Sequence, residues 1–152
     1  MKISVLMVSI LLFAVIFIPL AYLVTLSSRT EKKAKKALLN LGKNNHLDLG
    51  EIDIHGNLLL GYDAAHHKLA VSTKSNPERD LQIIDIPSLT SCEIRTARNH
   101  GKGLEWVELE LGSKEAVKHI VFYDENQDEG PVSDPMTSLM QAEKWKHRLV
   151  VA

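Results

Sequence analysis

The sequence predicts one N-terminal transmembrane helix followed by an α+β, mostly-β domain that ends in an amphipathic helix. Two observations predict this class. Residues 3–26 form an uncharged, predominantly apolar run of 24 positions. Beyond residue 46 the apolar residues change from a helical to an alternating period, which is typical of strands. We therefore expect a transmembrane anchor at 1–28, a basic juxtamembrane helix or linker at 29–45 and a soluble domain at 46–152.

The apolar run is long enough to cross a bilayer. As a helix it would measure about 36 Å, against a hydrocarbon core of about 30 Å. A cleaved signal peptide is the alternative, but its apolar core is usually about 7–15 residues and ends at a small-residue cleavage site. Residues 27–30 read Ser-Ser-Arg-Thr and offer no such site. The sequence therefore favours an uncleaved, single-pass anchor.

Basic residues follow the run. Residues 29–43 carry six Lys and Arg against one Glu, a net charge of +5. Because flanking Lys and Arg stay in the cytoplasm, we expect the N-terminus outside and the C-terminal domain in the cytoplasm. Four of these residues, Lys32, Lys33, Lys35 and Lys36, have two interpretations: they are a topology signal, or they contact anionic lipid headgroups.

Alternation predicts six strands, at 57–63, 68–73, 81–86, 90–98, 104–111 and 117–123, and a seventh within 47–54. In the segment 104–111 it places Glu105, Val107, Leu109 and Leu111 on the inner face. Glu108 and Glu110 then lie on a solvated face, and Trp106 faces outward or covers an edge.

A C-terminal helix follows the strands. Asp134 is positioned to cap it, and Pro135 occupies the first helical position, where proline is tolerated. Apolar residues then recur on one face at Leu139, Ala142, Trp145 and Leu149. The helix is therefore expected to cover the sheet with its tryptophan inward.

Antiparallel strands in sequence order, closed by a helix with a tryptophan, resemble the pleckstrin-homology-like (PH-like) domain. The residues that carry the resemblance are Tyr62-Asp63 with Lys68-Leu69, Ile84-Asp85-Ile86-Pro87 with Cys92-Glu93-Ile94, and Trp145. The resemblance implies a PH-like antiparallel barrel of six or seven strands with one open end plugged by the helix. The chain also looks like short bacterial membrane-anchored proteins, which implies the bacterial inner (cytoplasmic) membrane.

The sequence shows no recognisable short motif for catalysis or metal binding. The seven histidines show no HxxxH or HExxH spacing, and Cys92 is the single cysteine, so we expect no metal site and no cofactor. Cys92 is expected to be a buried structural thiol. Residues 44–152 carry 11 Lys and Arg against 18 Asp and Glu, a net of −7, which disfavours nucleic acid. We expect no catalytic residues, no enzyme and no small-molecule substrate.

Binding is the function that remains. The sequence predicts a non-catalytic accessory subunit or adaptor of a larger membrane complex, with other membrane-protein subunits as partners. The predicted partner surface is Trp106 with the acidic residues Asp124, Glu125, Asp128 and Glu129. Packing of Trp106 under the acidic loop is equally compatible with the pattern. The alternative functions are a stand-alone sensor of anionic lipid or membrane state, and an enzyme that carries no short motif.

Overall fold

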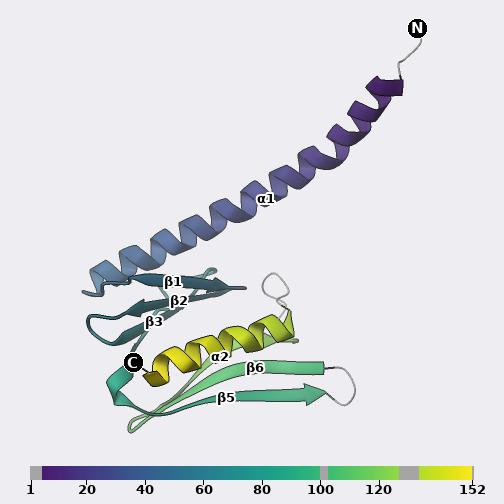
Figure 1. Ribbon diagram of the computed structural model, residues 1–152. Coiled ribbons are helices and arrows are strands. Elements are labelled where there is room, and N and C mark those ends of the chain that lie inside the picture. The colour runs from purple at the N-terminus through teal and green to yellow at the C-terminus, as the bar shows by residue number, and fades with distance from the viewer. Residues whose placement is uncertain (1–4, 100–102, 127–133, 152) are drawn as a thin grey trace. The chain divides into compact units, whose positions relative to one another are not determined.

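The computed structural model describes residues 5–99, 103–126 and 134–151. The chain divides into two compact units, Met1–Lys33 and Ala34–Ala152. The first helix, α1 (Val5–Asn44), is continuous across this division (Figure 1). The described part of the first unit is entirely helical, and the second unit contains all of the strands.

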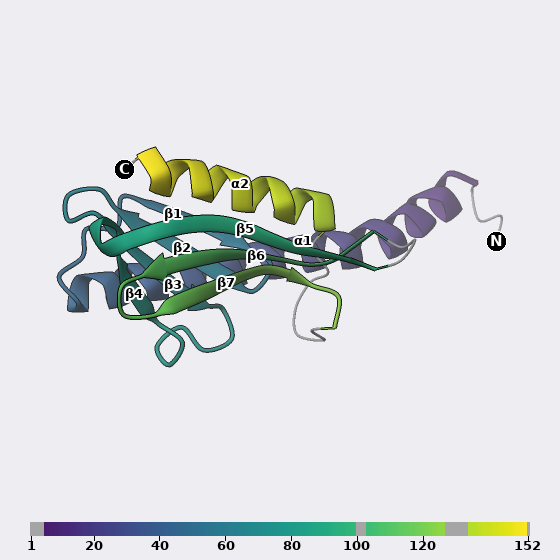
Figure 2. The same cartoon turned by 90° about the horizontal axis from the view of Figure 1, so that it is seen from below.

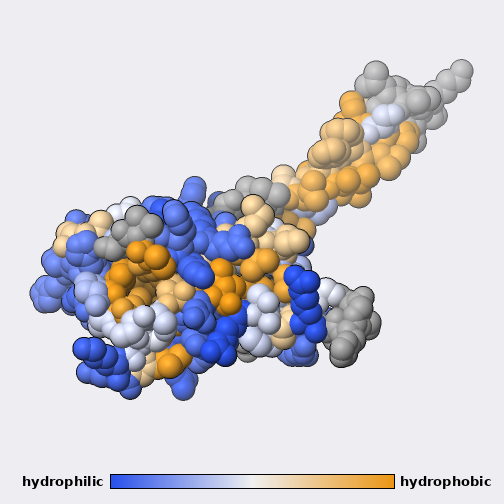
Figure 3. Space-filling model, turned by 60° about the horizontal axis from the view of Figure 1, so that its bottom comes forward, coloured by the Kyte–Doolittle hydropathy of each residue, from blue (hydrophilic) through white to orange (hydrophobic). Residues whose placement is uncertain are grey.

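The α1 residues of the first unit carry a broad apolar surface. Large apolar side chains between Met7 and Leu23 are 46–69% exposed, and Figure 3 shows apolar atoms dominating this stretch. Pro19 lies inside the helix without ending it. Apolar residues on every side of a helix are typical of one that is covered by other molecules.

The predicted transmembrane anchor at 1–28 is wrong. In the part of the chain that the structure describes, no helix combines the length and the hydropathy needed to cross a membrane. The apolar run that suggested the anchor belongs to a helix that continues through the lysine-rich segment to Asn44. The single-pass topology, the outside N-terminus and the location in a bacterial inner membrane are overturned with it. Ile3 and Ser4 of the predicted run lie outside the described residues.

Two antiparallel sheets form the second unit, each with its strands in sequence order. The first sheet comprises β1 (Glu51–His55), β2 (Leu58–Asp63), β3 (Lys68–Thr73) and β4 (Gln82–Asp85). A short 3-10 helix, η1 (Ile86–Ser88), leads to the second sheet. That sheet comprises β5 (Leu89–Asn99), β6 (Gly103–Ser113) and β7 (Val117–Asp124), and α2 (Pro135–Val151) follows.

The predicted closed barrel is also wrong, although an α+β composition is compatible with the structure. Among the described strands, hydrogen-bonded ladders join neighbours only within each sheet, so the sheets remain separate. Pro87 lies in η1 at the point where the chain leaves the first sheet. Proline has no N–H to donate to a ladder, which helps to end the pairing there.

The main core lies between the two sheets and is completed by α2. Trp145 is 1% exposed and packs with buried residues of both sheets, including Leu69 of β3 and Leu109 of β6. Figure 2 shows α2 running along one side of the two sheets. Asp134 accepts hydrogen bonds from the backbone N–H (2.8 Å) and the hydroxyl (2.9 Å) of Thr137, which confirms the predicted cap.

A second core covers the opposite face of the first sheet. The last turns of α1 contribute Ala34 and Leu38, and the segment after the helix contributes Leu47 and Leu49. Leu49 lies between two glycines. A Cβ added to Gly42 would lie 2.7 Å from Leu49 Cδ1, and one added to Gly61 would lie 3.0 Å from it. The absence of side chains at these glycines therefore allows helix and sheet to approach closely.

Replacing Gly42 with alanine is expected to destabilise the protein. Helix propensity alone favours alanine over glycine by about 1 kcal/mol. The new Cβ would instead displace Leu49, and overpacking of this kind costs about 1–3 kcal/mol. Urea unfolding should show a lower midpoint for Gly42→Ala. Adding Leu49→Ala should remove part of the overpacking cost in a double-mutant cycle.

Gly50→Ala is the matched control. A Cβ at Gly50 would meet no atom within 4 Å. Its unfolding midpoint should stay near that of the wild type. An equal loss of stability in both alanine variants, or a gain for Gly42→Ala, would contradict the packing described for Leu49.

Candidate functional site

The candidate site is on the outer face of the second sheet. Strand alternation sends the side chains of Val107, Leu109 and Leu111 into the core, where they are at most 1% exposed. This confirms the predicted inner face for these three residues, whereas Glu105 is only half-buried. Glu108 and Glu110 consequently lie on the opposite face of β6.

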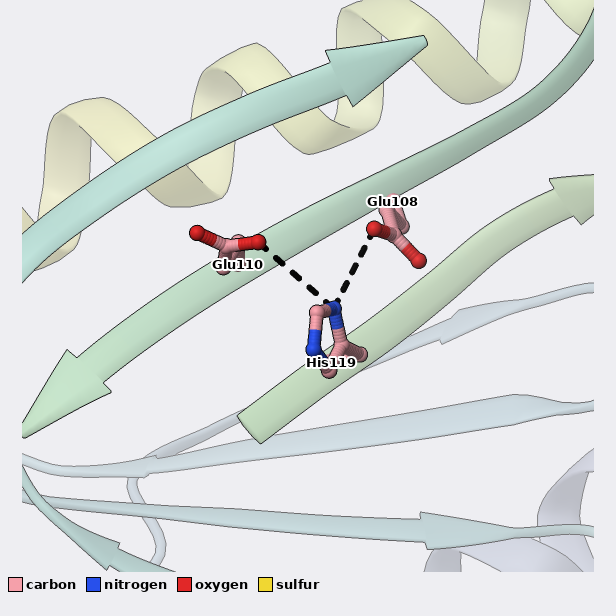
Figure 4. A group of neighbouring side chains, drawn as sticks. All are labelled: Glu108, Glu110 and His119. Carbon is pink, nitrogen blue, oxygen red and sulfur yellow. Dashed lines mark hydrogen bonds and ion pairs between the residues drawn. The ribbon is translucent and has the colours of Figure 1, made fainter. Parts of the chain in front are cut away.

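His119 of β7 completes a cluster with these carboxylates (Figure 4). In the β6–β7 register it lies opposite Glu110. Its Nδ1 is 3.1 Å from Glu108 Oε1 and 3.9 Å from Glu110 Oε2. The two Glu side chains are only 19% and 16% exposed, and that of His119 is 47% exposed. The cluster is therefore accessible from the His119 side.

Arg95 of β5 holds one of the two carboxylates. Its Nε lies 2.6 Å from Glu110 Oε2, and its Nη2 donates to Glu110 Oε1 at 2.8 Å. This bidentate geometry is the strong form of an arginine–carboxylate pair. The Arg95 side chain is nevertheless 54% exposed, so solvent screens the pair and reduces its contribution.

A pocket of about 420 Å³ lies beside the cluster. His119 and Val121 of β7 line one part of it, and Ser72 of β3 lines another. Arg79 and Asp80, from the segment before β4, supply one positive and one negative charge. His119 thus borders both the carboxylate cluster and the pocket, and a molecule in the pocket would lie close to the cluster.

The predicted partner surface is partly brought together. Trp106 is half-buried rather than exposed, and it pairs with Asp124 in the β6–β7 register. Glu125 is exposed, and its backbone N–H donates to the Glu105 carbonyl at 2.9 Å. Asp128 and Glu129 lie outside the described residues. Trp106, Asp124 and Glu125 are therefore the members of this surface that the structure describes.

The predicted lipid-headgroup residues lie on α1. All four, Lys32, Lys33, Lys35 and Lys36, are exposed. Ala34 and Leu38, which lie among them in sequence, are buried in the second core. The lysines are thus available for electrostatic contacts, and their role stays a prediction.

A contact between the buried Ser138 and the half-buried His55 is a feature that the sequence does not reveal. His55 Nε2 lies 2.8 Å from the Ser138 hydroxyl, which donates to the Asp134 carbonyl. Burial, together with the nearby Lys74 charge, lowers the pKa of His55. Ser138 is completely buried, and the pair connects β1 to α2. The two residues are 83 positions apart, so no local motif indicates the contact.

Asp63 is a second buried polar group. Its carboxylate accepts hydrogen bonds from the backbone N–H groups of Asp48, Ala65 and His66 and contacts the His66 ring. Burial raises the pKa of Asp63, but the Asp48 and His66 hydrogen bonds outweigh it and lower that pKa to about 2. The carboxylate stabilises the turn between β2 and β3 in its charged form.

Cys92 packs beside the main core but is half-buried, so it is less buried than the sequence predicted. Burial raises the pKa of its thiol, and the positive charge of Lys146 opposes that shift only in part. A raised pKa disfavours the thiolate, which is the nucleophilic form of cysteine.

We expect Asp63→Asn to destabilise the protein by about 1–3 kcal/mol near neutral pH, because the amide cannot accept all of these hydrogen bonds. Since the folded-state pKa is depressed from 3.8 to about 2, the carboxylate contributes its full stabilisation above about pH 4. That contribution is lost as the pH falls toward 2. The difference in unfolding free energy between wild type and variant should therefore shrink over this interval.

Asp85→Asn is the control, because Asp85 is exposed. It should change stability by less than about 0.5 kcal/mol. A wild-type advantage over Asp63→Asn that stays constant from pH 7 to pH 2 would show that the Asp63 carboxylate does not have this role.

Comparison of the chain with protein-family models, with curated proteins and with solved structures finds no match. The PH-like resemblance accordingly stays a prediction.

Proposed function

We propose that the chain is a non-catalytic accessory subunit or adaptor. The apolar surface of α1 between residues 7 and 23 associates with an apolar surface of a larger assembly. The second unit then presents its outer sheet face to a further partner. Both parts of this proposal concern binding, and neither requires a chemical step.

The observation that carries the proposal is the exposure of the α1 side chains. Monomeric proteins rarely expose a contiguous apolar patch larger than a few hundred Å². In α1, large apolar residues on all sides of the helix are about half or more exposed. Such a surface is stable in water only when another apolar surface covers it.

The sheet face is the proposed second binding surface. It combines the half-buried Trp106 and neighbouring Asp124 with the carboxylates of Glu108 and Glu110. A tryptophan beside acidic groups suits a partner with a basic rim around an apolar contact. The Ser138 hydroxyl is buried and hydrogen-bonded to the Asp134 carbonyl, which favours this binding role over hydrolytic chemistry.

Three glutamine substitutions on one side of α1 test the proposal. Leu12, Ile16 and Leu20 are 59%, 57% and 56% exposed and belong to neither core. Glutamine keeps a high helix propensity while removing the apolar surface. The full-length triple variant, isolated from its source cells in mild detergent, should lose most of a stoichiometric partner that the wild type retains. Quantitative mass spectrometry and size analysis measure the ratio.

The matched control replaces three exposed apolar residues of α2, Met136, Met140 and Val150, with glutamine. This variant should retain the partner. Equal partner recovery from both triple variants would contradict the proposal. If the wild-type protein is recovered without any partner, the result would instead favour the lipid-sensor alternative. The four exposed lysines of α1 are the observation that supports that alternative.

A further inference from the structure

We propose that Glu108, Glu110 and His119 bind a divalent transition-metal ion of the zinc class. The three side chains come from adjacent strands, β6 and β7, and each offers one ligand atom. The inference concerns the second unit alone and does not depend on what covers α1.

The separations between the ligand atoms fit a shared ion. Zinc lies about 2.0–2.2 Å from nitrogen and carboxylate oxygen, so two of its ligands are about 3.0–3.5 Å apart for usual coordination angles. His119 Nδ1 is 3.1 Å from Glu108 Oε1 and 3.9 Å from Glu110 Oε2. All three ligand atoms lie within 4.8 Å of one another. Small rotations of the side chains bring them to coordination distance.

Strand geometry holds the three groups in place. Glu108 and Glu110 are two residues apart and therefore share a face of β6. His119 is paired with Glu110 across the ladder and lies diagonal to Glu108. Figure 4 shows the imidazole directed between the two carboxylates. Because both glutamates are less than one-fifth exposed, little ordering of mobile side chains is needed for binding.

The donor set indicates the class of ion. One imidazole nitrogen and two carboxylate oxygens suit zinc and neighbouring first-row divalent ions better than magnesium or calcium, which prefer oxygen alone. Three protein ligands leave at least one coordination position open. Since His119 also borders the pocket, a ligand held there could complete the coordination.

Arg95 provides an internal test of the assignment. Its guanidinium neutralises Glu110 through both carboxylate oxygens, so it competes with a metal ion for the same group. Removing it should strengthen metal binding, whereas a purely structural cluster would give no such gain. Arg95 is more than half exposed and can move away when the ion binds.

The experiment is equilibrium dialysis of the full-length chain against Zn²⁺ in mild detergent, with bound metal measured by elemental analysis. The wild type should bind one equivalent saturably. His119→Gln and Glu108→Gln should each weaken that binding by at least about tenfold, because losing even a group that only supports a ligand costs about 10- to 100-fold in affinity. Arg95→Ala should tighten Zn²⁺ binding by about two- to fivefold, which is the fold-change that corresponds to the free energy of an exposed ion pair.

His147→Gln is the matched control, because His147 is an exposed histidine of α2. It should bind Zn²⁺ within about twofold of the wild type. With Co²⁺ as a paramagnetic probe, amide signals around residues 108, 110 and 119 should broaden before those of α2, and each variant's spectrum reports whether it is folded. The proposal would be overturned if the wild type showed no saturable Zn²⁺ binding. It would also be overturned if the control lost binding as much as the ligand variants, or if His119→Gln and Glu108→Gln bound Zn²⁺ as tightly as the wild type.

Discussion

Burial of the first sheet on both faces is the constraint on which the second unit depends. Leu49 fits between Gly42 and Gly61, so the last turns of α1 approach β2 closely. The other face of the sheet packs on the core around Trp145. For this reason β2 and β3 carry nearly continuous buried residues, whereas strands with one solvated face alternate.

The second sheet, in contrast, packs against the core with one face only. Its inner face is completed by α2, and its outer face carries polar groups, the half-buried Trp106 and the exposed Val117 and Val121 of β7. On that outer face the register places His119 of β7 beside two carboxylates of β6. The same histidine borders the pocket. Candidate binding features are therefore concentrated where the sheet is not needed to cover a core.

Sequence patterns predicted the features that depend on residues close together in the chain, namely strand positions and a helix cap. Alternation located the strands to within a few residues, and Asp134 was identifiable as a cap because its partner is three residues away. The closed barrel was wrong because closure depends on pairing between edge strands, which alternation does not encode. The transmembrane anchor was inferred from an uncharged run alone and is contradicted by the described helices. His119 meets Glu108 and Glu110 only through the β6–β7 register, so spacing motifs could not reveal the cluster.

Site-specific photo-cross-linking in the source cells tests the central claim that another protein covers the apolar surface of α1. A photoreactive amino acid replaces Ile16, which is 57% exposed, and in a matched chain it replaces the exposed Lys114. The probe at position 16 should yield one dominant adduct with a different protein, and the probe at position 114 should not. A lack of any protein adduct from position 16, or the same adducts from both positions, would contradict the claim.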